Sequence, residues 1–153
     1  MASAWRLVKT RFLAEAFGGE AAERYGGRWN SPGTAMVYLG ESVALCVLEI
    51  LVNLQSTKPL DSYSLIRVDY DPALVHELHA SQRPSDWTSF PAPASTQRLG
   101  DQWVQRATSV LLRVPSAVVA GEFNLLVNPA HREFRRLHIG PPAPFRFDPR
   151  LLR

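Results

Sequence analysis

The amino-acid sequence predicts an α+β fold in a single domain. Segments with strand composition are short and outnumber the helical ones. The connections late in the chain are of hairpin length, whereas alternating β-α-β units would need a helix between successive strands. The 153 residues suit one domain with a sizeable core, and neither a repeat nor a linker divides them.

Seven segments have the composition or the partial alternation that predicts strands. The fourth is ambiguous, and its shortness and its place just after Asp71-Pro72 favour a strand. The predicted strands cover residues 4–8, 35–39, 61–70, 73–80, 116–120, 123–128 and 135–139.

Two further segments predict helical structure. Residues 11–27 have helical composition, but Gly18 and Gly19 interrupt it, so only short helical turns are expected there. In residues 96–113 apolar side chains recur at helical spacing, which predicts a helix that ends before Pro115.

Loops are expected at two places. Pro32 and Gly33 occupy the two central positions that a type II turn prefers. Residues 81–95 are rich in proline and serine and contain no clear element. They indicate either a lid over a site or a variable excursion at the surface.

One carboxylate lies in a predicted helix that is otherwise almost entirely apolar. This helix would follow Ser42, a good N-cap, and run to about Leu54. An apolar surface this wide implies burial on most sides, so Glu49 lies either on a thin solvent-facing edge or at the floor of a cleft. The residues that share its narrow stripe are Ser42, Cys46 and Asn53.

A buried carboxylate needs a cation or a ligand, because an unpaired buried charge is costly. Arg28 is the nearest candidate in sequence. It follows Gly26 and Gly27, where the missing side chains let a backbone approach a ligand closely. Its guanidinium could form paired hydrogen bonds with phosphate or ribose oxygens. The alternatives are a structural salt bridge or an exposed turn residue.

Several familiar sites are not predicted. The sequence has neither a phosphate loop nor a G-x-G-x-x-G fingerprint. His76 and His79 lie three residues apart, but nothing completes a set of metal ligands, so no metal is expected. Cys46 is expected to be a small buried hydrophobic residue rather than a nucleophile. His131 is expected at the surface or as the cap of a turn.

The charge is basic, with a net charge of +3 from fifteen arginines and two lysines against 14 acidic residues. A solvated tail, a partner surface or a nucleic-acid site could each explain the basic C-terminus. Six of the arginines fall in the last 22 residues: Arg132, Arg135, Arg136, Arg146, Arg150 and Arg153.

The sequence favours a cytoplasmic protein. No stretch reaches the roughly 18 apolar residues that a membrane span requires. The N-terminus lacks the apolar core of a secretory signal. The single cysteine cannot form an intramolecular disulfide, which suits a reducing compartment.

Four blocks of sequence, together with Arg6 near the start, carry a family resemblance. They are GGRWN with Arg28, VYLGESVALCVLEILVNL with Tyr38 and Glu49, VPSAVV with Ser116, and FNLLVNPAH with Asn124, Asn128 and His131. In order and spacing they resemble the RES domain, the toxin half of a bacterial toxin–antitoxin system. The resemblance covers about residues 5–139 of a single domain, 1–153, that ends in a basic extension.

The resemblance implies an ADP-ribosyltransferase-like fold, with two small, mostly antiparallel sheets around an NAD cleft and flanking helices. It implies a toxin that cleaves the nicotinamide–ribose bond of NAD, by hydrolysis or phosphorolysis, and arrests growth by depleting NAD. It leaves open a mono-ADP-ribosyltransferase that modifies a protein. The implied partner is a helix-turn-helix, Xre-like antitoxin that blocks the cleft. A homo-oligomer within that complex is compatible with it, whereas direct DNA binding and membrane association are not expected.

The chemistry of NAD suits a single carboxylate. The leaving nicotinamide already carries a positive charge, so its departure needs no general acid, unlike that of an ordinary glycoside. Glu49 would bind a ribose hydroxyl and stabilise the oxocarbenium-like transition state. Arg28 would clamp the diphosphate or the nearby ribose, and Tyr38 would stack on the nicotinamide. The alternative for Tyr38 is an ordinary aromatic residue of the core.

The remaining matched residues would support this chemistry. Ser116 and Asn124 would donate hydrogen bonds to the nicotinamide amide or to Glu49, and Arg6 would contribute to NAD binding. Local capping is the structural alternative for Ser116 and Asn124. A function of another class, a basic RNA-binding or RNA-cleaving module, would use His131, His138 and the C-terminal arginines, but no RNA-recognition motif supports it.

Overall fold

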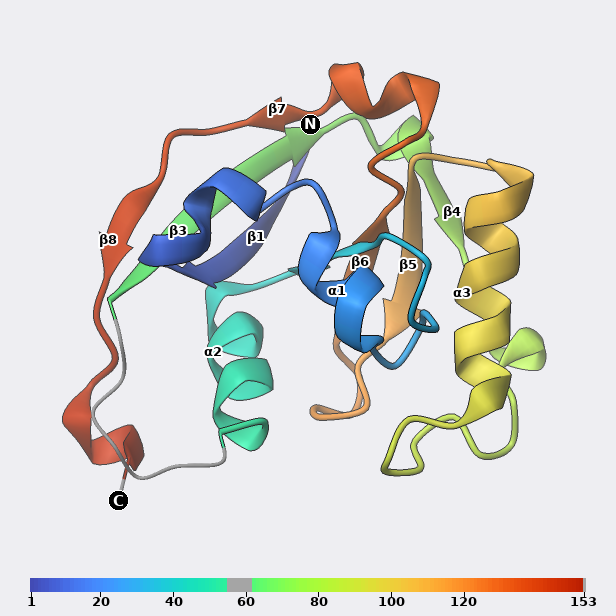
Figure 1. The fold of residues 1–153 in the computed structure, drawn as a ribbon, viewed down its shortest axis with the longest axis horizontal. Coiled ribbons are helices and arrows are strands. Elements are labelled where there is room, and N and C mark those ends of the chain that lie inside the picture. The colour runs from blue at the N-terminus through green and yellow to red at the C-terminus, as the bar shows by residue number, and fades with distance from the viewer. Residues whose placement is uncertain (55–61, 153) are drawn as a thin grey trace.

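A single curled sheet of eight strands forms the centre of the structure, a computed structural model that describes residues 1–54 and 62–152 (Figure 1). The strands are β1 (Ala2–Lys9), β2 (Val37–Gly40), β3 (Tyr63–Tyr70), β4 (Val75–Glu77), β5 (Leu111–Pro115), β6 (Phe123–Val127), β7 (His138–Ile139) and β8 (Ala143–Phe145). Their order is β4-β5-β6-β2-β1-β3-β7, and β8 also pairs with β3. Among the paired strands of the described residues, only β4 and β5 run parallel. The α+β class is confirmed.

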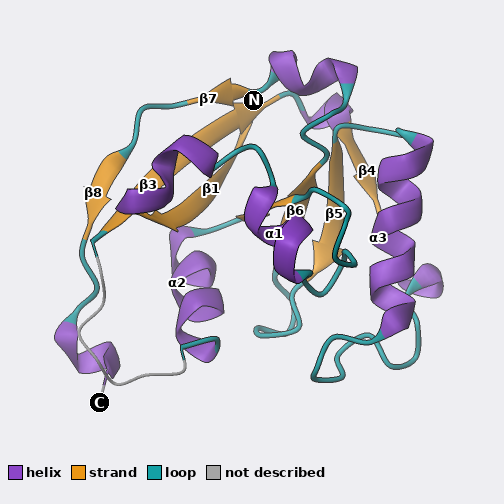
Figure 2. Ribbon diagram, viewed as in Figure 1, coloured by secondary structure: helices purple, strands orange, loops and turns teal. Residues whose placement is uncertain are grey.

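Within the same residues, three α-helices and five short 3-10 helices connect the strands (Figure 2). In the view of Figure 1, α1 lies between α2 and α3. The α-helices are α1 (Glu20–Tyr25), α2 (Val43–Val52) and α3 (Ala94–Arg106). The 3-10 helices are η1 (Thr10–Glu15), η2 (Pro72–Leu74), η3 (Ala80–Gln82), η4 (Arg132–Arg136) and η5 (Pro149–Leu152).

The sheet has two halves that meet at one residue pair. β1 pairs with β3 along its whole length, but it pairs with β2 only at Trp5 and Gly40. The expectation of two separate small sheets is therefore corrected to one continuous sheet that splays at its middle. Side chains explain the splay, because Arg6 donates to the carbonyl of Tyr38 and Cys46 donates to the carbonyl of Trp5.

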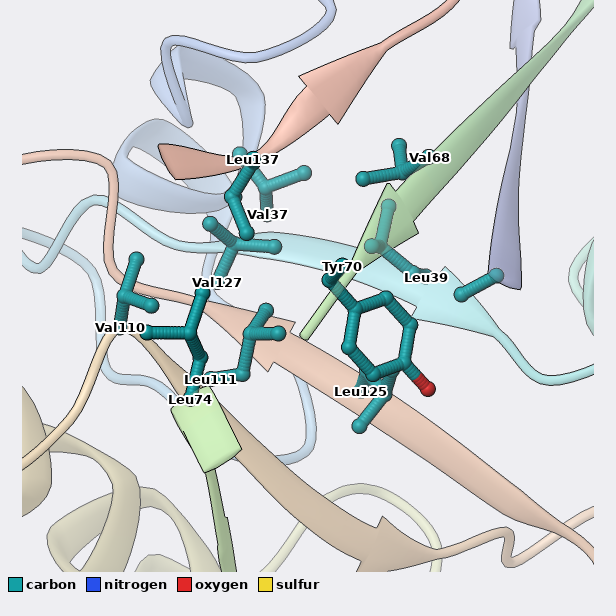
Figure 3. Packing of buried hydrophobic residues seen from close by; sticks show 11 residues of the cluster. Val37, Leu39, Val68, Tyr70, Leu74, Val110, Leu111, Leu125, Val127 and Leu137 are labelled. Carbon is teal, nitrogen blue, oxygen red and sulfur yellow. The ribbon is translucent and has the colours of Figure 1, made fainter. Parts of the chain in front are cut away.

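The two faces of the central strands have separate roles. Alternate residues of β2, β5 and β6 build the largest core cluster, which includes Leu39, Leu111 and Leu125 (Figure 3). Because side chains alternate along a strand, Tyr38 and Asn124 lie on the opposite face. That face packs against α1, α3 and the segment between α1 and β2.

Most of the local predictions are confirmed. Ser42 caps α2 by accepting a hydrogen bond from the amide of Leu45. Gly33 has a φ of +103°, as the third residue of a type II turn requires. Gly19 is also left-handed and separates η1 from α1. Of residues 73–80, predicted to be a strand, only Val75–Glu77 form one, β4, because the ends of the segment belong to η2 and η3. Asp61 and Arg153 lie outside the described residues.

The third helix is shorter than predicted. It ends at Arg106, and Ala107 has a left-handed φ of 48°. The apolar residues that follow are both buried: Val110 lies just before β5, and Leu111 is the first residue of that strand. A buried strand is apolar at successive positions, so its residues continued the helical spacing by coincidence.

Residues 116–120 form a turn instead of the predicted strand. The hydroxyl of Ser116 accepts hydrogen bonds from the amides of Val118 and Val119. A side chain that binds its own backbone in this way competes with strand pairing.

The prediction of a strand over 135–139 is also mostly wrong, because η4 occupies its first half. His131 caps this 3-10 helix by accepting a hydrogen bond at Nδ1 from the amide of Glu133, and only His138–Ile139 pairs with β3. In the described ranges, none of the helices has the length and apolar character needed to cross a membrane.

We predict that Gly100→Ala destabilises the protein, although alanine normally stabilises a helix interior relative to glycine. A Cβ atom at position 100 would lie 1.6 Å from the backbone oxygen of Trp29. Urea denaturation should show a free energy of unfolding lower by about 1–3 kcal/mol. Gln102→Ala, at an exposed position of the same helix, is the control and should have little effect. An unchanged or higher stability of Gly100→Ala would contradict the packing described here.

Candidate active site

Glu49 points from α2 toward the end of β5. Its Oε1 accepts a hydrogen bond of 3.0 Å from the hydroxyl of Ser116, and its side chain is half-buried. This contact rules out the open solvent-facing edge as the position of the carboxylate. At the C-terminal end of α2, the side-chain amide of Asn53 donates a hydrogen bond to the backbone carbonyl of Glu49.

Ser116 can donate its proton only toward Glu49. The serine is 2% exposed, and its oxygen accepts hydrogen bonds of 3.1 Å from both Val118 and Val119. A hydroxyl carries one proton and two lone pairs, so both lone pairs are occupied and the proton remains for the carboxylate. The turn after β5 therefore orients the serine and holds Glu49 in a fixed position.

The surroundings of Glu49 act on its pKa in opposite directions. Burial raises the pKa above the ordinary value for glutamate and is the largest effect. Hydrogen bonds from Ser116 and Asn124 and the charge of Arg28 lower it, without cancelling the effect of burial. Asn124 is itself fixed, because its amide also donates to the carbonyl of Leu39 in β2.

Arg28 is held by neutral acceptors. Its Nη1 donates to the backbone carbonyls of Trp87 and Ser89, at 2.9 and 2.8 Å. Among the described residues it forms no ion pair, so the salt bridge considered from the sequence is not found there. Its charge nevertheless lowers the pKa of Glu49, although less than the hydrogen bonds from Ser116 and Asn124 do.

Tyr38 is bound through its hydroxyl to the segment that carries Arg28. The hydroxyl donates to Oδ1 of Asn30 and accepts a hydrogen bond from the amide of Trp29. Burial raises its pKa, so the phenol stays neutral. Asn30 is fully buried, and its amide lies within hydrogen-bond distance of three backbone carbonyls, those of Ala22, Ser31 and Thr34.

Arg6 lies in the splay between β1 and β2. Its Nε donates to the carbonyl of Ala16 at 2.6 Å and its Nη1 to that of Tyr38 at 3.2 Å. Burial lowers its pKa, and within the described chain it has no carboxylate partner. Like Arg28, it is a cation whose hydrogen bonds within residues 1–54 and 62–152 all go to backbone oxygens.

Cys46 and His131 have structural roles. The Cys46 thiol is buried, donates to the carbonyl of Trp5 and has a pKa raised by burial to about 11, as expected for a residue that is not a nucleophile. Both ring nitrogens of His131 are engaged, one with Glu133 and the other with the carbonyl of Ala107. The described residues contain no group of three or more side chains placed to hold a metal ion.

Comparison with known proteins assigns the chain to a family. The family model described as the RES domain matches residues 3–148. The chain belongs to the RES domain family.

Relatives of this RES domain are similar over most of their length. "Toxin Res" of Yersinia enterocolitica is 41% identical over 148 residues, which cover 96% of this chain and 97% of the relative. "Toxin Res" of Photorhabdus laumondii is 35% identical, with 86% and 85% covered. The "Prs ADP-ribosylating toxin" of a Sphingobium strain is 34% identical, with 99% and 97% covered.

A solved structure has the same fold. The crystal structure of the M. tuberculosis MbcT–MbcA toxin–antitoxin complex contains a chain that superposes with a TM-score of 0.78, covering 99% of this RES domain and 86% of that chain. The sequence identity is 22%, so the likeness is one of fold. It supports the α+β class predicted from the sequence.

The structure brings together four of the six predicted site residues through direct contacts or charge effects: Glu49, Ser116, Asn124 and Arg28. Tyr38 contacts the backbone amide of Trp29, the neighbour of Arg28, and Arg6 contacts the carbonyl of Tyr38. The sequence reasoning missed the carbonyls of Trp87 and Ser89, since a backbone acceptor leaves no signal in residue type. It also missed Asn30, although this residue lies in the GGRWN block.

We predict that Tyr38→Phe lowers the stability of this RES domain. The change leaves the buried amide of Trp29 and the oxygen of Asn30 without their partner, which should lower the free energy of unfolding by about 1–3 kcal/mol. Tyr25→Phe is the control, because Tyr25 is 74% exposed and should change stability by less than about 0.5 kcal/mol. Equal stability of the two variants in urea would show that the Tyr38 hydroxyl does not hold the segment.

Proposed function

We propose that this RES domain is the toxin of a toxin–antitoxin pair and that it cleaves the nicotinamide–ribose bond of NAD. One observation carries the proposal: Glu49 is oriented by Ser116 and Asn124 beside the uncancelled charge of Arg28. The names of the relatives as toxins support the biological role.

Glu49 would stabilise the positive charge that develops on the ribose. As the C–N bond breaks, its electron pair returns to the cationic ring and neutral nicotinamide leaves. Water then adds to the anomeric carbon of the ribose, giving ADP-ribose and a proton. If phosphate adds instead, the product is ADP-ribose phosphorylated at that carbon. A carboxylate fixed before the reaction stabilises such a transition state without the cost of reorienting.

Arg28 and Arg6 would bind the anionic part of the dinucleotide. Each guanidinium is fixed by carbonyl oxygens, which do not neutralise its charge. Nη2 of Arg28 has no partner within the described residues, so it remains available to a phosphate or a ribose oxygen. Tyr38 would place its ring against the nicotinamide.

An antitoxin would be the natural partner of such an enzyme, because unrestrained loss of NAD would stop the growth of the cell that makes it. We expect a helix-turn-helix, Xre-like protein that blocks access to Glu49 and Arg28. The solved structure with the same fold is a toxin–antitoxin complex, which supports this expectation. The reaction needs no metal and would take place in the cytoplasm, where NAD is available.

A second candidate function is mono-ADP-ribosylation of a protein. It keeps the same bond cleavage and changes only the acceptor, which becomes a protein side chain. The relative named "Prs ADP-ribosylating toxin", 34% identical across 99% of this chain, favours it. Nicotinamide is released in both cases, whereas the ADP-ribose ends on protein only in the second.

We predict that Glu49→Gln lowers the rate of nicotinamide release at least about a hundredfold, as the loss of an electrostatic stabiliser of the transition state does. Adenine-labelled NAD, incubated with the purified protein in a cell extract, reports the acceptor: label on a small molecule supports hydrolysis or phosphorolysis, and label on a protein band supports transfer. Glu23→Gln, on the exposed surface of α1, is the control. No nicotinamide from the wild type, or equal release by Glu49→Gln, would contradict the proposal.

We predict that Ser116→Ala moves the acidic limb of the pH–rate profile to higher pH. Activity requires ionised Glu49, so the rate falls as the pH drops through a pKa that burial has already raised. Removing the Ser116 hydrogen bond, which favours the carboxylate, raises this pKa further. The measurement is kcat/KM against pH, with Ser109→Ala as the control. A limb that stays in place or moves to lower pH would show that Ser116 does not act on Glu49.

A further inference from the structure

One continuous segment, residues 87–101, holds the segment 27–31 along its whole length. Its loop part supplies the carbonyls of Trp87 and Ser89 to the Arg28 side chain. Its helical part, the first two turns of α3, holds the backbone on both sides of the same arginine. The helical contacts come from Thr96, Gln97, Gly100 and Asp101.

The spacing of these four residues places them on one face of α3. Positions 96, 97, 100 and 101 form two adjacent pairs that are four residues apart, about one helical turn, so they lie along a single side of the helix. Gln97 donates to the carbonyl of Gly27 at 3.1 Å, and Asp101 accepts a hydrogen bond of 3.0 Å from the amide of Ser31. Gly100 lies against the carbonyl of Trp29, with no space for a side chain.

Thr96 makes the contact nearest to the functional side chain. It is fully buried, and its hydroxyl donates to the backbone carbonyl of Arg28 at 2.6 Å. The carbonyl of Pro93, one turn earlier, lies 3.1 Å from the same hydroxyl. A buried threonine 68 residues away in sequence thus bonds the backbone of Arg28 directly.

We propose that Thr96 is a positioning residue, which fixes the Arg28 backbone so that its guanidinium meets the anionic part of NAD at a set place. The inference rests on the proposed function. Arg28 is held at both ends by residues 87–101: Thr96 bonds its backbone carbonyl, and the carbonyls of Trp87 and Ser89 bond its Nη1. Without the Thr96 hydrogen bond, the backbone of Arg28 is less fixed and the guanidinium can change its orientation at the two carbonyls.

The kinetic consequence follows from what Arg28 would bind. The diphosphate and outer ribose do not change during cleavage of the nicotinamide bond, so contacts to them stabilise the bound substrate and the transition state equally. Losing such contacts raises KM and leaves kcat nearly unchanged. Loss of a group that acts on the breaking bond, such as Glu49, would instead lower kcat.

The test compares Thr96→Val with Thr96→Ser. Valine keeps the shape of threonine and removes its hydroxyl, whereas serine keeps the hydroxyl. For Thr96→Val we expect a KM for NAD raised about tenfold, with kcat within about threefold of the wild type. Thr96→Ser should remain within about threefold of the wild type in both constants, since it can still donate to the Arg28 carbonyl.

Two further variants separate positioning from general stability. Ser109→Ala removes a hydroxyl at the other end of α3, where it bonds Trp103 and the carbonyl of Leu111, and should leave KM unchanged. Gln97→Ala removes the bond to Gly27 without touching the buried hydroxyl, so it tests the same idea if Thr96→Val fails to fold. We expect it to raise KM about threefold.

Calorimetric titration with ADP-ribose gives a readout that needs no turnover. Weaker binding by Thr96→Val, about tenfold, with wild-type binding by Thr96→Ser and Ser109→Ala, supports the positioning role. If the wild type binds ADP-ribose in this pattern but releases no nicotinamide, the proposed function fails and the positioning role stands. A wild-type KM for Thr96→Val, a defect in kcat alone, or wild-type protein that does not bind ADP-ribose would overturn the inference.

Discussion

The rest of the site depends on the separation of β1 from β2 after their single pair at Trp5 and Gly40. A complete ladder between these strands would leave no place for the side chains that now end it. Arg6 takes one of the free carbonyls and Cys46, from the first turns of α2, takes another. The same splay lets α2 start directly beside the sheet, and α2 carries Glu49 to the end of β5.

Three arginines of the described structure are held in two different ways. Arg113 makes two hydrogen bonds to Glu41, contacts Glu77 and lies over the ring of Phe123, so its charge is neutralised within the fold. Arg6 and Arg28, in contrast, are fixed by backbone carbonyls and keep their charge. Carboxylate partners compensate the charge of an arginine within the fold, whereas neutral carbonyl partners fix its position and leave the charge uncompensated.

Sequence patterns succeeded where the determining forces are local. The cap at Ser42, the turn at Gly33 and the break at Gly19 each depend on one side chain or on one permissive glycine. Patterns failed where strand and helix signals overlap. Val110 and Leu111 continued a helical pattern of apolar residues, although Leu111 begins β5. Val118 and Val119 are strand-forming residue types, but their amides bond the hydroxyl of Ser116 and form a turn.

The sequence by itself determined the α+β class, the family and the residue types of the site, because composition, order and spacing are properties of the chain. The family resemblance left open whether Ser116 bonds Glu49 or the nicotinamide amide. Only the tertiary structure decided that Ser116 bonds Glu49, and that Arg28 is held by the carbonyls of Trp87 and Ser89. The separation in sequence is 67 residues for Glu49 and Ser116, 59 for Arg28 and Trp87, and 61 for Arg28 and Ser89. A contact over such a separation has no periodicity, and a backbone acceptor is the same for every residue type, so no pattern in the sequence can record it.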